Sequence, residues 1–210
     1  MFDGPYFLIL VPALLLAITC HEFAHAAIAR VFGDRTAQEQ GRLTLNPLAH
    51  LDPLGTVMIF LVGFGWGKPV PVNLSRLRHP RADAFVSAAG PLTNLLLAYL
   101  AAQLFLAHRA HQPTGVLRSN DWLALWLAVM MQLNLGLCFF NLIPLFPLDG
   151  SHVLPQLLPG DLGARVAAWN HRYGSLILLA GILLGRFTKL DFFAAFLNPP
   201  ITFFSRLWLG

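Results

Sequence analysis

Three long apolar runs constrain the fold of this chain more than any other feature of its sequence. They cover residues 6–29, 84–107 and 122–142. A helix rises about 1.5 Å per residue, so about 20 apolar residues are enough to cross the hydrocarbon core of a bilayer. Charged residues make up only 11% of the 210 residues, whereas a typical soluble domain carries roughly 25%. The sequence therefore predicts an all-α membrane protein that crosses the bilayer several times.

Shorter apolar segments complete the predicted architecture. Residues 53–66 include three glycines and are too few for a comfortable span, which favours a re-entrant segment shielded from lipid by the protein. Residues 151–172 are expected to form a short interfacial helix, and residues 173–186 and 192–209 are again apolar. Together with the long runs, these segments predict about five to six transmembrane helices and one short re-entrant segment.

We expect a single domain over residues 1–210, with a core at about 6–160 and a C-terminal helical hairpin at about 173–209. The N-terminal residues lack a basic region and a small-residue cleavage pattern, so we do not expect a removed signal peptide.

The segment GKPVPVN, residues 67–73, predicts a small membrane-associated β element. Proline has no N–H group, so Pro69 and Pro71 confine this segment to the edge of a sheet. Because side chains and backbone groups alternate with period two, the N–H groups of Val70 and Val72 point to the same edge. We expect this edge to bind another extended chain.

Lysine and arginine are distributed unequally between the polar segments. If residues 30–83, residues 149–172 and the C-terminus share one side of the membrane, that side carries ten of them and the other side carries four. Positively charged loops favour the cytoplasm, which predicts a multi-pass protein of the cell (inner) membrane. The net charge is only +4 and no Lys- or Arg-rich block is present, so we expect no nucleic-acid partner.

The first apolar run contains the motif H-E-x-x-H, formed by His21, Glu22 and His25. Residues four apart share a helix face, so both imidazoles can bind one metal ion. Glu22 is adjacent and can act as a general base on water without being a ligand. Three titratable groups in one membrane helix are costly and usually mark function. We expect a metal site near the cytoplasmic end of this helix.

A catalytic zinc site needs a third protein ligand and an open position. Asp149 is the favoured candidate, because Pro144 and Pro147 break the helix before it on the side where the first run ends. Asp52, just past the first run, is a rival. His152 is a weaker rival that fits better as a residue supporting a ligand.

Three segments together resemble the site-2 protease family of intramembrane zinc metalloproteases. They are HEFAH at 21–25, AAGPLTN at 88–94 and NLIPLFPLDG at 141–150. The similarity covers roughly residues 6–160 and is greatest to compact bacterial members without PDZ or CBS domains.

The resemblance implies a ligand set, a base and a substrate class. By that resemblance, His21, His25 and Asp149 bind one Zn²⁺ per chain and Glu22 is the catalytic base. Asn94 is implied near the oxyanion and Asn141 near the substrate backbone. The segment that contains Val70 and Val72 would then pair with an unwound transmembrane protein substrate. The oligomeric state stays open.

Two other functions use the same residues. A membrane metal transporter would bind its ion with these ligands without using Glu22 as a base, but its ligands would follow a pathway across the membrane. A non-proteolytic membrane binding module would not need an intact Glu22. The role of residues 41–56, where His50 and Asp52 form either a structural pair or a substrate gate, is left open by the sequence.

Overall fold

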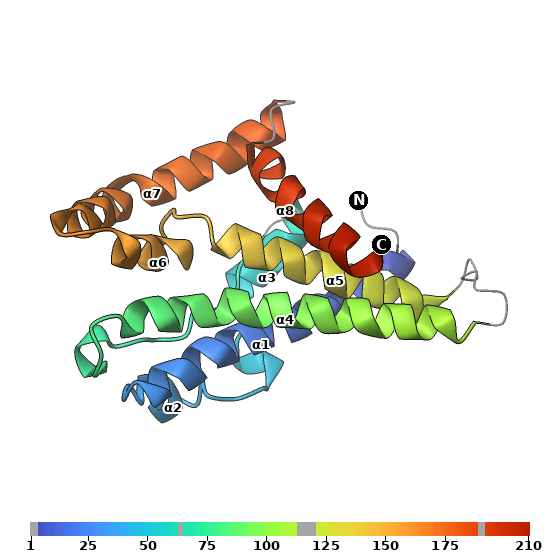
Figure 1. Ribbon diagram of the computed structural model, residues 1–210, viewed down its shortest axis with the longest axis horizontal. Helices are drawn as coiled ribbons and strands as arrows, with labels where there is room; N and C mark the ends of the chain where they lie inside the picture. Colours follow the sequence, from blue (N-terminus) through green and yellow to red (C-terminus); the bar gives the residue numbers. More distant parts are fainter. Residues whose placement is uncertain (1–3, 63–64, 113–120, 189–191) are drawn as a thin grey trace.

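The structure is a computed structural model that describes residues 4–62, 65–112, 121–188 and 192–210. The regular elements within these residues are all helices (Figure 1). The helices and short 3₁₀ turns, in chain order, are α1 (Gly4–Val31), α2 (Thr36–Glu39), η1 (Pro47–Ala49), α3 (Pro53–Val62), η2 (Leu74–Arg76), α4 (Ala82–Ala110), α5 (Trp122–Asn141), α6 (Gly150–Leu157), α7 (Asp161–Phe187) and α8 (Phe192–Leu209).

Helices α1, α4 and α5 pack against one another and form the centre of the molecule. Small side chains line their contacts: Ala13 on α1 and Ala98 and Ala102 on α4 are completely buried. Such residues let helix backbones approach closely, which is how membrane helices gain packing energy in a solvent as apolar as their own side chains. Met130 and Leu135 of α5 fill the remaining space in this core.

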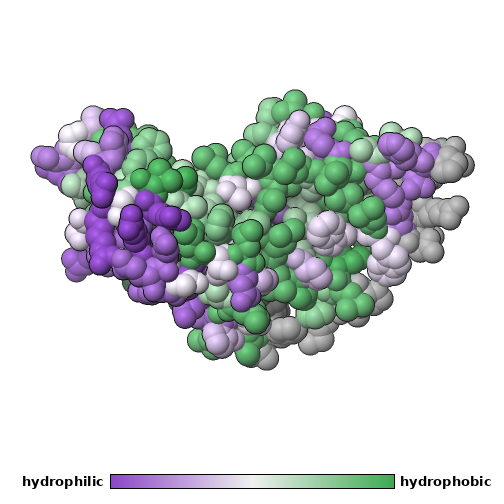
Figure 2. Space-filling model, turned by 90° about the horizontal axis from the view of Figure 1, so that it is seen from below, coloured by the Kyte–Doolittle hydropathy of each residue, from purple (hydrophilic) through white to green (hydrophobic). Residues whose placement is uncertain are grey.

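These three helices are also the ones that are long and apolar enough to cross a membrane within the described residues. They comprise Phe7–Val31, Ala82–Ala110 and Trp122–Asn141, with 25, 29 and 20 residues. Figure 2 shows apolar residues across the middle of the molecule, with polar residues gathered toward its two ends. The predicted all-α membrane protein is thus confirmed, whereas the predicted number of five to six spans is not.

The helices α3 and α7 compare differently with the prediction: α3 agrees with it and α7 departs from it. With ten residues, α3 rises only about 15 Å and is too short to span. The expected boundary at residue 172 does not exist, because α7 continues from Asp161 to Phe187. Near residue 172 the sequence changes from polar to apolar, but it contains no proline that would end a helix. The apolar stretch therefore begins in the middle of α7. α8 returns from α7 and packs on α5, as Figure 1 shows.

The predicted β element is not confirmed, since the described residues contain no strand. One isolated antiparallel bridge joins Leu51 to Gly67. Beyond it, Pro69 and Pro71 have no N–H groups to donate to a ladder, and the neighbouring N–H groups of Val70 and Asn73 bond to side chains. The segment runs beside α1 without a partner strand.

Candidate metal centre

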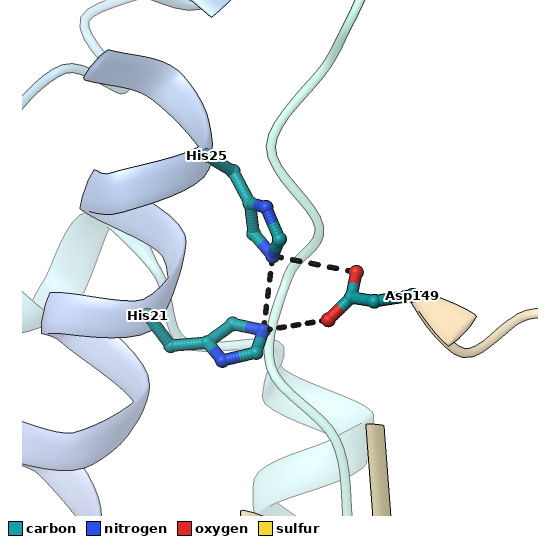
Figure 3. Close-up of side chains that lie close together, drawn as sticks. All are labelled: His21, His25 and Asp149. Atoms are coloured by element: carbon teal, nitrogen blue, oxygen red, sulfur yellow. Dashed lines mark hydrogen bonds and ion pairs between the residues drawn. The ribbon is translucent and has the colours of Figure 1, made fainter. Parts of the chain in front are cut away.

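His21, His25 and Asp149 converge on one point (Figure 3). The two histidines are one turn apart on α1, and Asp149 immediately precedes α6. The Nε2 atoms of the two rings are 3.0 Å apart. Asp149 Oδ2 lies 3.2 Å from His21 Nε2, and its Oδ1 lies 3.4 Å from His25 Nε2. The structure therefore brings together the three residues that the sequence favoured as ligands.

The protonation of the two rings shows what this point is suited to hold. Nδ1 of His21 donates to Asn94 Oδ1 at 2.6 Å, and Nδ1 of His25 donates to the carbonyl of Val86 at 2.7 Å. Both acceptors are oxygens without a proton, so in the neutral rings the hydrogen is on Nδ1 and each Nε2 presents a lone pair. With both rings in this neutral form, two lone pairs and a carboxylate face one another, and a cation at this point would satisfy all three.

The spacing fits a tetrahedral ion. Ligand atoms about 2.0–2.1 Å from a tetrahedral zinc ion are about 3.3 Å from one another, close to the separations of 3.0, 3.2 and 3.4 Å found here. Asp149 Oδ2 is buried and makes no hydrogen bond of acceptable geometry, despite its closeness to His21. Two imidazoles and one carboxylate form a donor set that suits zinc and leaves a fourth position open.

Gly90 on α4 provides the space for this cluster. A Cβ atom at residue 90 would overlap His25 Nε2 and would lie 2.6 Å from His21 Nε2. The absent side chain thus leaves room at the point where the ligand atoms meet.

A polar relay across three helices holds His21. Asn94 on α4 is 0% exposed, and its Nδ2 donates to Asn134 Oδ1 at 2.8 Å and to Ala17 O at 3.4 Å. Asn134 on α5 donates in turn to Met130 O at 2.8 Å. These bonds hold the Asn94 amide with its oxygen toward His21. A histidine that binds a metal through one ring nitrogen usually donates the N–H of the other to such an acceptor, which fixes the orientation of the ring.

Comparison with known proteins places the chain in a family. Residues 110–184 match the family described as Peptidase family M50. The chain is 43% identical to "Putative zinc metalloprotease YwhC" of Bacillus subtilis over 171 residues, 81% of this chain and 78% of that protein. The chain belongs to peptidase family M50. The resemblance to site-2 proteases drawn from the motifs is thereby confirmed.

More distant M50 relatives agree. The chain is 34% identical over 182 residues to "Putative zinc metalloprotease Rip2" of Mycobacterium tuberculosis, covering 82% of this chain and 66% of that protein. It is 29% identical over 161 residues to "Putative zinc metalloprotease MJ0611" of Methanocaldococcus jannaschii, covering 73% of this chain and 75% of that protein. No solved structure matches the chain.

In this M50 chain, Asp149 is positioned by the turn that follows α5. Asn170 on α7 is buried and bonds that turn twice: its Oδ1 accepts from Phe146 N–H and its Nδ2 donates to Pro144 O, both at 2.9 Å. Gly150, next to Asp149, lies so close to Leu142 O that a Cβ atom would overlap it. The prolines predicted that the helix ends before Asp149, and the hydrogen bonds from Asn170 on α7 hold the resulting turn in place.

The rival ligands have other partners. Asp52 Oδ1 accepts from Gly55 N–H at 2.7 Å and so caps the first turn of α3. His152 Nδ1 bonds Asp83 Oδ2 at 3.1 Å, which joins α6 to α4. Neither belongs to the ligand group that the described residues form.

The residues expected to contact substrate differ in their hydrogen-bond partners and in their burial. Asn94 is buried beneath His21 with no exposed surface, which supports a role in holding that ring rather than in contacting an oxyanion. Asn141 donates to Leu137 O within its own helix at 2.9 Å. Glu22 accepts from Val70 N–H through Oε2 at 2.9 Å, whereas no hydrogen bond to Val72 N–H occurs within the described residues.

Two buried asparagines were missed by the sequence analysis. Asn134 interrupts an apolar run in the middle of α5, and such a residue in a membrane helix usually bonds across to a neighbouring helix, so a signal was present. Asn170 lies among polar residues of α7, where nothing in the sequence distinguishes it.

Proposed function

We propose that this chain is an intramembrane zinc endopeptidase that hydrolyses peptide bonds in or near transmembrane segments of membrane proteins. The observation that carries the proposal is the ligand cluster of His21, His25 and Asp149, whose two histidines lie beside Glu22 on the membrane-capable helix α1. Membership of family M50 and the zinc metalloproteases among its relatives support the same reaction.

The residues of the chain divide the reaction between them. His21, His25 and Asp149 would hold the zinc, and Glu22 would take a proton from the attacking water and deliver it to the leaving amine. Zinc supplies a Lewis acid that polarises a peptide carbonyl and makes water acidic enough to ionise near neutral pH. Asn94 and the carbonyl of Val86 keep the two imidazoles in the binding orientation by accepting their Nδ1 protons.

The surroundings of the site suggest how a substrate arrives. A helical substrate hides its carbonyl groups, so it must unwind locally before Glu22 can act. The extended segment at residues 67–73 is the proposed edge on which the unwound piece lies, with Val72 as a donor to it. Asn141 remains a candidate contact to the substrate backbone.

We propose that the protein spans the cell (inner) membrane several times with its site toward the cytoplasm. The excess of Lys and Arg on the polar segments flanking the site supports this orientation. In this arrangement α7 and α8 form a C-terminal hairpin beside a core of residues 6–160, and α3 is a re-entrant element. Such a molecule forms one domain within the lipid bilayer.

A cleavage assay on defined reporters tests the proposal. The purified protein is reconstituted in vesicles with a panel of single-span reporter proteins, with and without a zinc chelator. We expect cleavage inside or beside the transmembrane span of the reporter. The chelator should stop this cleavage and added Zn²⁺ should restore it, whereas the Glu22→Gln protein should not cleave. Cleavage that survives chelation, or a zinc-loaded protein that cleaves no member of the panel, would refute the assignment.

A further inference from the structure

The extended segment beside α1 has almost no free backbone donors. Lys68 N–H donates to His50 O at 2.9 Å, and Asn73 N–H donates to Asp34 Oδ2 at 2.7 Å. Pro69 and Pro71 have no N–H group. Val70 N–H is taken by Glu22 Oε2 at 2.9 Å. Within the described residues, Val72 is left as the one backbone donor of residues 68–73 without a protein acceptor.

From this arrangement we infer that the backbone N–H of Val70 is the positioning group of the catalytic base, an inference that rests on the proposed function. Glu22 has three rotatable bonds, and its position one residue after His21 does not by itself direct the carboxylate. The hydrogen bond engages Oε2, so Oε1 is the oxygen left to act on water. Oε1 lies on the side of Gly67, 3.9 Å from where a Cβ atom of that residue would stand.

The donor is itself held firmly by residues that do not touch the metal cluster. Arg42 is buried and its Nη2 donates to Lys68 O at 2.6 Å, while His50 binds the N–H of the same residue. At the other end, Asp34 is 1% exposed and also accepts from Thr36. The segment is thus tied on both sides of Val70. This gives Arg42 and His50 a function, because they hold the extended segment that orients Glu22.

The two flanking prolines leave Val70 as the backbone donor that Glu22 can reach in this stretch. Because neither neighbour has an N–H group, Glu22 meets a single donor in the stretch 69–71 and cannot shift to an adjacent one. A side-chain substitution at residue 70 leaves this donor in place. The inference therefore concerns one backbone group and is tested by replacing that group alone.

The test exchanges the amide N–H for an ester oxygen. Val70 is replaced by α-hydroxyisovaleric acid through nonsense suppression, with the same exchange at Val72 as matched control. On a transmembrane reporter that the wild-type protein cleaves, we expect the ester at 70 to lower kcat on the order of ten-fold, since charge-assisted hydrogen bonds are the strong ones. KM and zinc content should stay within two-fold.

The control separates positioning of the base from binding of substrate. The ester at 72 should raise KM and leave kcat nearly unchanged. Wild-type kcat for the ester at 70, or a change confined to KM, would overturn the inference. Chelator-sensitive cleavage by the wild-type protein with no effect of the ester would refute the positioning role alone, whereas absence of cleavage by the wild type would refute the proposed function.

A second readout needs neither activity nor metal. In zinc-free protein labelled with ¹⁵N-valine, we expect the amide of Val70 to exchange with solvent at least ten-fold more slowly than in Glu22→Ala, because its acceptor is then lost. Asp52→Ala, which leaves this contact intact, should not change the exchange rate. Equal exchange in the wild-type and Glu22→Ala proteins would show that the hydrogen bond does not form.

Discussion

Gly90→Ala should damage the metal centre through a single methyl group. The new Cβ atom would overlap His25 Nε2 and lie 2.6 Å from His21 Nε2, closer than such atoms approach without displacement. Gly90 is on the buried side of α4, so the methyl group cannot turn toward lipid. The imidazoles must move instead.

The cost of that movement follows from the hydrogen bonds at the other ring nitrogens. His21 is bonded to Asn94 at 2.6 Å and His25 to Val86 O at 2.7 Å, so neither ring retreats without stretching a bond of about 0.5–1.5 kcal/mol. Loss of such support typically lowers metal affinity 10- to 100-fold. With both rings affected, we expect zinc affinity to fall about 100-fold. The helix itself gains about 0.5–1 kcal/mol from alanine, so the protein still folds.

Zinc affinity is measured by competition with a chromophoric chelator in detergent, beside thermal unfolding of the metal-free protein. Gly136→Ala on α5 is the matched control, because a Cβ atom there meets nothing within 4 Å. The control should bind zinc as the wild type does. Wild-type zinc affinity in Gly90→Ala would refute the reasoning and show that the ligands do not converge beside residue 90.

Five further substitutions test separate parts of the site. Glu22→Gln should abolish cleavage and keep zinc content near wild type by elemental analysis; loss of metal would make Glu22 a ligand. Asp149→Ala should lower both zinc content and cleavage, whereas Asp52→Ala should mainly lower the melting temperature, and the reverse pattern would exchange their roles. Asn134→Leu should lower zinc affinity about ten-fold in a chelator competition, because Asn94 loses an acceptor; unchanged affinity would dissociate the relay from the metal site. Val72→Pro should raise KM for a transmembrane reporter with zinc content unchanged, and an unaltered KM would exclude its N–H as a substrate contact.

The part of the site that was predictable depends on local geometry. Helix periodicity alone places His21 and His25 on one face, and the structure has them one turn apart on α1. Asp149 could be favoured because prolines break the chain where a second helix ends near the same level. Both arguments need only the local path of the backbone, which composition and proline positions largely determine.

Features that depend on contacts between helices could not be predicted. Asn94 was expected near an oxyanion, but its surroundings depend on α1 and α5, which meet it from two sides. The continuity of α7 was missed because a change in polarity resembles a change in structure when only hydropathy is considered. The number of five to six spans is not confirmed, since only three helices among the described residues are long and apolar enough to cross a membrane. Apolar segments that pack on other helices resemble segments that face lipid when only hydropathy is considered.

The prolines at residues 69 and 71 leave Val70 and Val72 as the backbone donors between residues 69 and 72, yet these two donors are not equivalent. A backbone N–H that is shielded from water must find an acceptor, and Glu22 provides one for Val70. Among the described residues 68–73, Val72 is therefore the backbone donor left without a protein acceptor, and it is the donor that we propose for an incoming chain. On this proposal, a substrate held at Val72 would lie two residues along the segment from the N–H that binds Glu22, so the short segment would couple the register of the substrate to the position of the proposed base.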